Sequence, residues 1–362
     1  MKITGFPGFD AAAAASGLVR ARVTDLTAQV ASGQRAQTFA GLGEEAGLAL
    51  DLRSERARRE AVASAARRAE AFAEATQTAL GGIYGSARDI LDNAQRVLVT
   101  GLPGSDGASI KTMAATARAS LKTIVGLLGE RFAGEALFGG AAPDQVPIVS
   151  ATAIETTGLF TQIRAKVQTL GPGNASAILA DTKALAQSND AAVSPFRGFA
   201  ASAASGEQTD ARRSVPVGDG ISIPIGMYAY KNAAAISEGQ TTGSWPRDLM
   251  WGLTIIANVQ PPDLASRADY RVLIEGAIAA LRSATDALVE DQAALGVDQS
   301  RLSVAAERNE NIALQVETQI GRLEAVDMSD VITQLTNSKN LLEASYRAMV
   351  TLGDLSLTKF MR

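Results

Sequence analysis

The stretch that decides the fold is residues 274–323, IEGAIAALRSATDALVEDQAALGVDQSRLSVAAERNENIALQVETQIGRL. Its small, apolar and occasional polar side chains recur in alternating steps of three and four. The repeat comprises Ile274, Ala277, Leu281, Ala284, Leu288, Asp291, Leu295, Asp298, Leu302, Ala305, Asn309, Ile312, Val316, Gln319 and Leu323. A sustained repeat of 3.5 residues is typical of a coiled-coil seam. The pattern therefore predicts one long helix that needs a partner along its length.

A matching partner lies in the N-terminal third of the chain. There the same spacing comprises Leu48, Leu52, Glu55, Arg59, Val62, Ala66, Ala69, Ala73, Thr76, Leu80, Ile83, Ala87, Ile90, Ala94 and Val97. A shorter helix is predicted over residues 109–129, with Met113, Ala117, Leu121, Ile124 and Leu128 on its inner face. Neither long helix can bury its narrow seam alone, so we expect the two to pair as an antiparallel rod.

Two further helices are predicted at the extremes of the chain. The first has Val23, Leu26 and Val30 on one face and ends at Ser32-Gly33. The second begins after residue 328, with Ser329 as its expected N-cap. We expect the apolar faces of these helices to serve packing and assembly. The candidate residues are Val23, Leu26, Val30, Val331, Leu335, Leu342, Met349 and Leu352.

The middle of the chain differs in kind, because it holds both tryptophans and an alternating stretch. Residues 213–225 predict a β-hairpin with its turn at Gly218 to Gly220. We therefore expect a mainly α protein, a helical rod built from both ends of the chain with an inserted α+β outer domain. The expected divisions are residues 1–45, 46–138, 139–265, 266–326 and 327–362.

Composition restricts the function. The 362 residues include no cysteine and no histidine, which removes disulfides, thiol nucleophiles, and thiolate or imidazole metal ligands. A net charge of -4 does not favour nucleic-acid binding, and no apolar run approaches the ~20 residues of a membrane helix. We expect no cofactor, no metal and no enzymatic activity. The opening residues, with Pro7, Gly8 and Asp10, also do not fit a cleaved Sec signal.

Three local motifs have structural explanations. The glycine loop at residues 41–46 formally matches a dinucleotide-binding loop, but it follows a helix and carries Glu44 and Glu45, which would repel a pyrophosphate. The arginines between residues 53 and 68 alternate with glutamates at helical spacing, which predicts ion pairs. The Ser-x-x-Lys spacing at Ser356 and Lys359 lacks companion motifs.

Two segments near each end of the chain form a recognisable pattern. Near the N-terminus, Leu26 to Arg35 predict a helix ending in Ser-Gly-Gln-Arg, and Gly43 to Ser54 contain an acidic-Ala-Gly turn and a helix opening in Leu-Arg-Ser. Near the C-terminus, residues 323–331 and 340–357 predict a closing helix. Together these segments resemble the flagellin family of bacterial flagellar axial proteins. The resemblance covers roughly residues 15–130 and 270–362, and it implies a structural subunit that self-assembles through its terminal helices.

Within this family, two kinds of subunit fit. The segment Arg131 to Gly140 and the ending Ala344 to Met349 are similar to the hook-associated subunit that joins the hook to the filament. The alternative is the major filament flagellin, of which divergent members exist, and Glu44-Glu45 stands where both groups commonly carry Asp-Asp. Outside the family, a cytoplasmic coiled-coil adaptor would share the heptads.

The resemblance also implies partners and a location. They are further copies of the chain, a neighbouring hook-associated protein, flagellin and an export chaperone, with no nucleic acid and no membrane. The expected location is the extracellular flagellum, reached by type III export.

Overall fold

The computed structural model describes residues 7–99, 107–197, 212–218, 220–236, 241–263 and 265–360. Side chains are described for these residues except 7–12, 99 and 352–360. The chain forms two compact units. The terminal unit comprises Met1–Ala61 and Asn309–Arg362, and the central unit comprises Val62–Arg308. The two long helices, α2 (Ala46–Val99) and α8 (Arg267–Glu324), contribute residues to both units.

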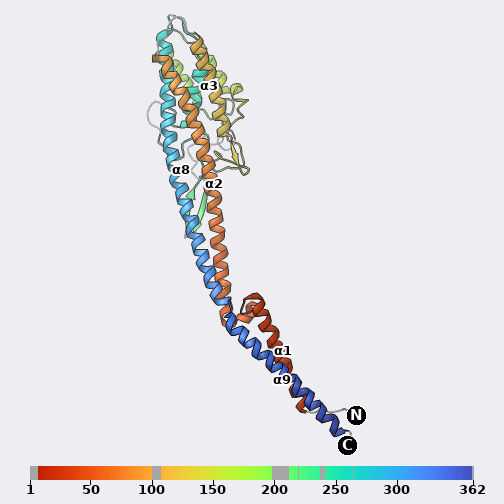
Figure 1. Cartoon of the computed structure of the whole chain (residues 1–362). Coiled ribbons are helices and arrows are strands. Elements are labelled where there is room, and N and C mark those ends of the chain that lie inside the picture. The colour runs from red at the N-terminus through yellow and green to blue at the C-terminus, as the bar shows by residue number, and fades with distance from the viewer. Residues whose placement is uncertain are drawn as a thin grey trace. The chain divides into compact units, whose positions relative to one another are not determined.

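In the terminal unit, helix α1 (Pro7–Ser32) packs along helix α9 (Met328–Phe360), as Figure 1 shows. A 3₁₀ segment, η1 (Phe39–Glu45), leads from α1 toward α2. The carboxylate of Asp327 accepts hydrogen bonds from the backbone N–H groups of Ser329 (2.9 Å) and Asp330 (3.3 Å). The prediction of Ser329 as the N-cap of α9 is therefore wrong. Asp327 lies just before the helix, where its carboxylate reaches the free N–H groups of the first turn.

In the central unit, α2 and α8 run antiparallel, side by side (Figure 1), and the Gln77 side chain donates from Nε2 to the carbonyl of Gln292 at 2.7 Å. The heptad positions are buried between Ala66 and Ala94 in α2. The inner face predicted for residues 109–129 is also buried in helix α3 (Gly107–Leu128). Leu48 is an exception in the terminal unit, since it is exposed while Ala49 is buried.

The middle of the chain adds further elements to the central unit. They are the two-residue strands β1 (Arg131–Phe132) and β2 (Glu135–Ala136), the 3₁₀ turn η2 (Ile154–Thr156), helices α4 (Gly158–Gln168), α5 (Ala175–Gln187) and α7 (Trp245–Asn258), and strands β3 (Ser214–Gly218) and β4 (Ile221–Pro224). The predicted hairpin is confirmed, because β3 and β4 pair antiparallel with Val215 opposite Ile223. Asp219 of its turn lies outside the described residues.

Helix α7 is the centre of this packing. All 14 of its residues are buried, and it contacts α3, α4 and α5. A Cβ at Gly252 would lie 3.0 Å from the carbonyl of Ala277, so α7 also approaches α8 closely. The inserted segment and the long helices thus share one hydrophobic core. The mainly α class with an α+β insertion is confirmed, while the five domain boundaries stay a prediction.

The segment Leu137 to Gly140 also belongs to this core. Phe138 is fully buried, and its carbonyl accepts from the backbone N–H of Ala229 at 3.0 Å. Gly140 has a φ of +58°, and a Cβ there would lie 2.1 Å from the ring of Tyr228. Only glycine fits this close approach. Gly140, which carries part of the family resemblance, therefore has a packing role.

Candidate assembly surface

The face shared by α1 and α9 holds the predicted packing residues. Leu26 and Val331 are buried, with 5% and 4% of their surface exposed. The other described members are only half-buried: Val23, Val30, Leu335, Leu342 and Met349. Leu352 lies in α9, but its side chain is outside the described residues. Two helices alone thus cover the seam incompletely.

Polar contacts align α1 on α9. Arg20 donates from Nη2 to the hydroxyl of Tyr346, and its guanidinium carbon lies 5.9 Å from the centre of that ring. Arg22 donates to the side-chain oxygen of Gln334 at 3.1 Å. Exposed contacts of this kind contribute little stability, so they act mainly on alignment. The heptad pattern, which marks apolar positions, does not identify them.

An apolar stripe flanks the seam on α9. It comprises Met328, Ile332, Tyr346 and Val350, which are 40%, 49%, 38% and 65% exposed. These residues share one side of α9, because 100° per residue places all four within about 40° of one another. On α1, Leu18 is 75% exposed. Lys339 and Glu343 fall on or next to this side of α9 between Ile332 and Tyr346, so the stripe consists of two exposed apolar patches. Exposed apolar patches of this kind mark regions of protein contact.

The two connectors between long and terminal helices are bonded to each other. Gln34 and Ala325 form an antiparallel bridge, the N–H of Arg35 donates to the carbonyl of Glu324 at 2.7 Å, and the N–H of Val326 donates to Gly33 at 3.1 Å. Arg53 of α2 forms an ion pair of 2.6 Å with the buried carboxylate of Glu324. These contacts fix where α1 and α9 leave the rod helices within the terminal unit.

The predicted pairing of the arginines in α2 is confirmed. Arg58 and Arg59 both contact Glu55, and Arg67 contacts Glu70. The pKa of Glu55 is lowered, first of all by its hydrogen bond with Arg59. Other pairs join Arg56 to Glu60 on the same helix and to Glu317 on α8. Carboxylates thus neutralise much of this basic run and leave it poorly suited to phosphate binding.

One polar cluster of the central unit was not predicted. The carboxylate of Asp291, at a seam position of α8, is buried and accepts from the N–H groups of residues 233–235 at 2.6 to 2.9 Å. It also accepts from the indole of Trp245 at 2.8 Å. The one signal of this role in the sequence is an acidic residue at a seam position of a mostly apolar repeat, a feature that Asp291 shares with Asp298.

Buried ionisable groups elsewhere in the central unit also support structure. The guanidinium of Arg247 donates to the carbonyls of Tyr230, Ala186 and Ser188, and burial lowers its pKa. Burial raises the pKa of the neighbouring Asp248, whose Oδ1 accepts from the N–H of Thr242 at 2.7 Å. In the described part of the chain, no group of acidic side chains is placed to hold a metal ion. None of the helices described there has the length and apolarity needed to cross a bilayer.

Comparison with known proteins identifies the C-terminal part of the chain. Residues 278–361 match the family model described as the bacterial flagellin C-terminal helical region. This match confirms the resemblance to flagellins over α9 and most of α8. No curated protein sequence matches the chain significantly.

The fold has a counterpart among solved structures. It is similar to a protein from Vibrio parahaemolyticus described as a flagellar hook-associated protein. The TM-score is 0.50 at 12% sequence identity, over 77% of this chain and 97% of that chain. At this identity the likeness concerns the fold. The likeness in sequence therefore rests on the family match over residues 278–361, and the solved structure adds a likeness of fold.

Proposed function

On the premise that α8 and α9 contain a flagellin C-terminal helical region, we propose that this protein joins the hook of a bacterial flagellum to its filament. The subunit self-assembles through α1 and α9. The observation that carries the proposal is the incompletely covered face of this helix pair, with its half-buried seam and exposed apolar stripe.

The hydrophobic effect supplies the free energy for this assembly. Burying a large apolar side chain contributes ~1.5–3 kcal/mol, so covering Leu18, Ile332 and Val350 with neighbouring subunits contributes several kcal/mol per copy. Further copies of the chain supply such surfaces in a tube or ring. The described candidate residues Val23, Leu26, Val30, Val331, Leu335, Leu342 and Met349 then hold α1 and α9 together while the stripe contacts neighbours.

A position at the junction is favoured over one along the filament by two likenesses. The segment Arg131 to Gly140 and the ending Ala344 to Met349 resemble hook-associated subunits, and the solved structure of similar fold is described as hook-associated. The major filament flagellin remains the second candidate, because the terminal helices serve both kinds of subunit equally.

The proposed partners follow from this position. They are a hook-associated neighbour on one side, flagellin on the other, and an export chaperone before assembly. The proposed location is extracellular, reached by type III export without cleavage of a Sec signal. Neither nucleic acid nor membrane has a role in this proposal.

Immunogold electron microscopy, with an antibody against the hairpin of β3 and β4, tests the proposal on flagellated cells, because most of this hairpin is accessible. A single label where hook meets filament is the expected result. Label along the whole filament would favour flagellin instead. Flagella without label would contradict both flagellar assignments.

Truncation distinguishes the two flagellar assignments from a cytoplasmic adaptor. Removing residues 1–45 or 327–362 should abolish incorporation into the flagellum. An adaptor would instead retain its partner when either terminal segment is removed, as pull-down from the cytoplasm would reveal.

A further inference from the structure

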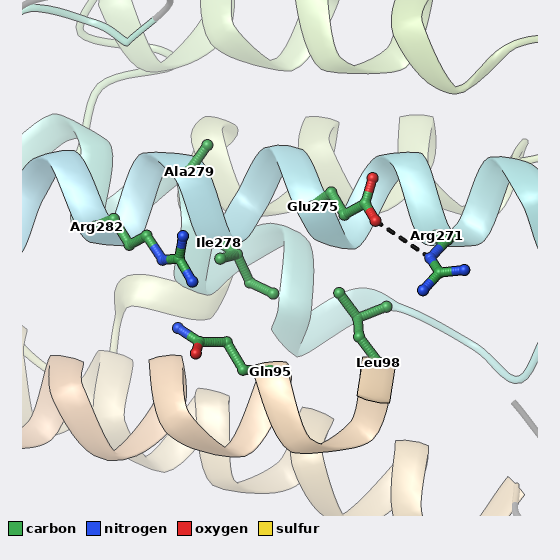
Figure 2. Close-up of a pocket in the computed structure, with 7 residues that line it drawn as sticks. All are labelled: Gln95, Leu98, Arg271, Glu275, Ile278, Ala279 and Arg282. Carbon is green, nitrogen blue, oxygen red and sulfur yellow. Dashed lines mark hydrogen bonds and ion pairs between the residues drawn. The ribbon is translucent and has the colours of Figure 1, made fainter. Parts of the chain in front are cut away.

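A groove lies between the end of α2 and the beginning of α8 in the central unit (Figure 2). Its volume is about 550 Å³, and it is lined by Gln95, Leu98, Arg271, Glu275, Ile278, Ala279 and Arg282. This volume is within the ~300–1,000 Å³ typical of binding pockets. The groove is therefore large enough to accept several side chains of a partner.

The lining indicates the chemistry of the occupant. Leu98 and Ile278 provide an apolar floor, while Arg271 and Arg282 supply two cations at the rim (Figure 2). Arg271 is paired with Glu275 at 3.2 Å. Arg282 forms no ion pair with a described residue, so its guanidinium is available to a carboxylate. An apolar side chain flanked by acidic residues fits this arrangement.

The chain itself carries such a surface farther along α8. Leu314 is 66% exposed, more than any other large apolar side chain described in α2 or α8. Glu310 and Glu317 lie at i−4 and i+3 from it, which places both on its face of the helix. Glu317 also contacts Arg56 within the chain. We call Leu314 with these two glutamates the acidic ridge.

We propose that the groove of one subunit accepts the acidic ridge of a second copy. In this contact, Leu314 covers the apolar floor, and Glu310 approaches Arg282. The inference rests on the proposed function, because it takes another copy of the chain as the partner. Groove and ridge are different surfaces, so the contact is heterologous. Repeated heterologous contacts form a ring when the rotation closes and a helical polymer when it does not.

Cross-linking provides a direct test, since the chain has no cysteine of its own. Ala279→Cys places a thiol in the groove, and Thr318→Cys places one a turn beyond Leu314. Mixed flagella carrying both variants, and the concentrated full-length chains, are treated with a short bismaleimide. We expect a cross-linked dimer only where both variants are present. Thr78→Cys, at an exposed position of α2 far from the ridge, replaces Thr318→Cys as the matched control and should give none.

Charge reversal distinguishes a second copy from another acidic partner. Arg282→Glu and Glu310→Arg should each reduce cross-linking roughly tenfold, and the chain carrying both changes should recover most of the yield, because the pair is restored with opposite sign. Arg68→Glu, outside the groove, should leave the yield unchanged.

Two results would overturn the inference. One is the absence of the cross-link from both flagella and concentrated chains. The other is sensitivity to Arg282→Glu without rescue by Glu310→Arg, which would indicate another partner. Neither result affects the proposed function, which fails only if the chain is absent from flagella.

Discussion

The central and terminal units use the same kind of helix but close their cores to different extents. In the central unit, α7 is buried over its whole length, and the inner face of α3 is at most 1% exposed from Met113 through Leu128 at the predicted heptad positions. In the terminal unit, Leu26 and Val331 are buried, whereas Leu342 and Met349 are half-buried.

The difference arises from the number of layers. The central helices receive a third layer from α4, α5 and α7, so their inner faces are covered and belong to one core. In the described residues, α1 and α9 pack mainly against each other, and a pair of helices buries only the narrow face between them. A unit with its own core should respond to mutation by losing stability, and a unit completed by neighbours should respond by losing assembly.

The largest expected effect is on assembly. Leu342→Asp places a carboxylate in the α1–α9 seam, where covering it with a neighbouring subunit would leave a desolvated charge. We expect incorporation into flagella to be lost, while thermal unfolding of the central unit is unchanged. The number of immunogold-labelled flagella measures incorporation, and calorimetry measures thermal unfolding. Asn340→Asp, which adds the same carboxylate on the opposite, exposed side of α9, is the control. Normal assembly by Leu342→Asp would remove the seam from the assembly mechanism.

The next effect concerns the central core. Asp291→Ala leaves three backbone N–H groups and the indole of Trp245 without their acceptor, at a cost of ~1–3 kcal/mol for each buried group that stays unsatisfied. We expect a loss of roughly 4 kcal/mol or more in the free energy of unfolding, measured with urea. Asp286→Ala on the exposed face of α8 should cost less than about 0.5 kcal/mol. Equal midpoints of urea unfolding for the two variants would contradict the structural role of the Asp291 carboxylate.

A smaller, pH-dependent effect is expected at Asp269. Its carboxylate accepts from the N–H groups of Gly173 and Ala175 at the start of α5, and these bonds lower its pKa below the ordinary 3.8. A lowered folded pKa contributes stability above the unfolded value, and this is lost as the pH falls through the folded value. Asp269→Asn should therefore lower the melting temperature at pH 7 and reduce its dependence on pH between about 5 and 2. The same acid dependence in both proteins would exclude Asp269 as its source.

The smallest effect is expected at the turn between β1 and β2. Ala133 and Gly134 have φ values of +50° and +87°, and alanine adopts such a conformation reluctantly. Ala133→Asn should raise the stability of the central unit by ~0.5 kcal/mol, because asparagine tolerates this conformation better. Ala133→Val should lower it. Thermal melts of the three proteins should rank Asn above Ala above Val, and the reverse order would argue against this turn.

Part of the assembly surface could be read from spacing. The heptads identified the faces of α1 and α9 because residues three and four apart lie on one side of any helix. Spacing could not predict the contact of Arg20 with Tyr346 or that of Arg53 with Glu324, since each joins residues more than 250 positions apart. The exposed stripe from Met328 to Val350 also became apparent only once the neighbours of α9 were known.

The sequence by itself determined the local features of this protein: long helices, their inner faces, the β3–β4 hairpin and the flagellin-like ends. These depend on periodicity and on turn residues, which act over a few positions. The tertiary structure alone decided that Ala49 rather than Leu48 is buried, that Asp291 binds the loop before α7, and that α7 joins the core of the long helices. Each of these depends on which surfaces meet, and that is set by packing between segments far apart in the chain.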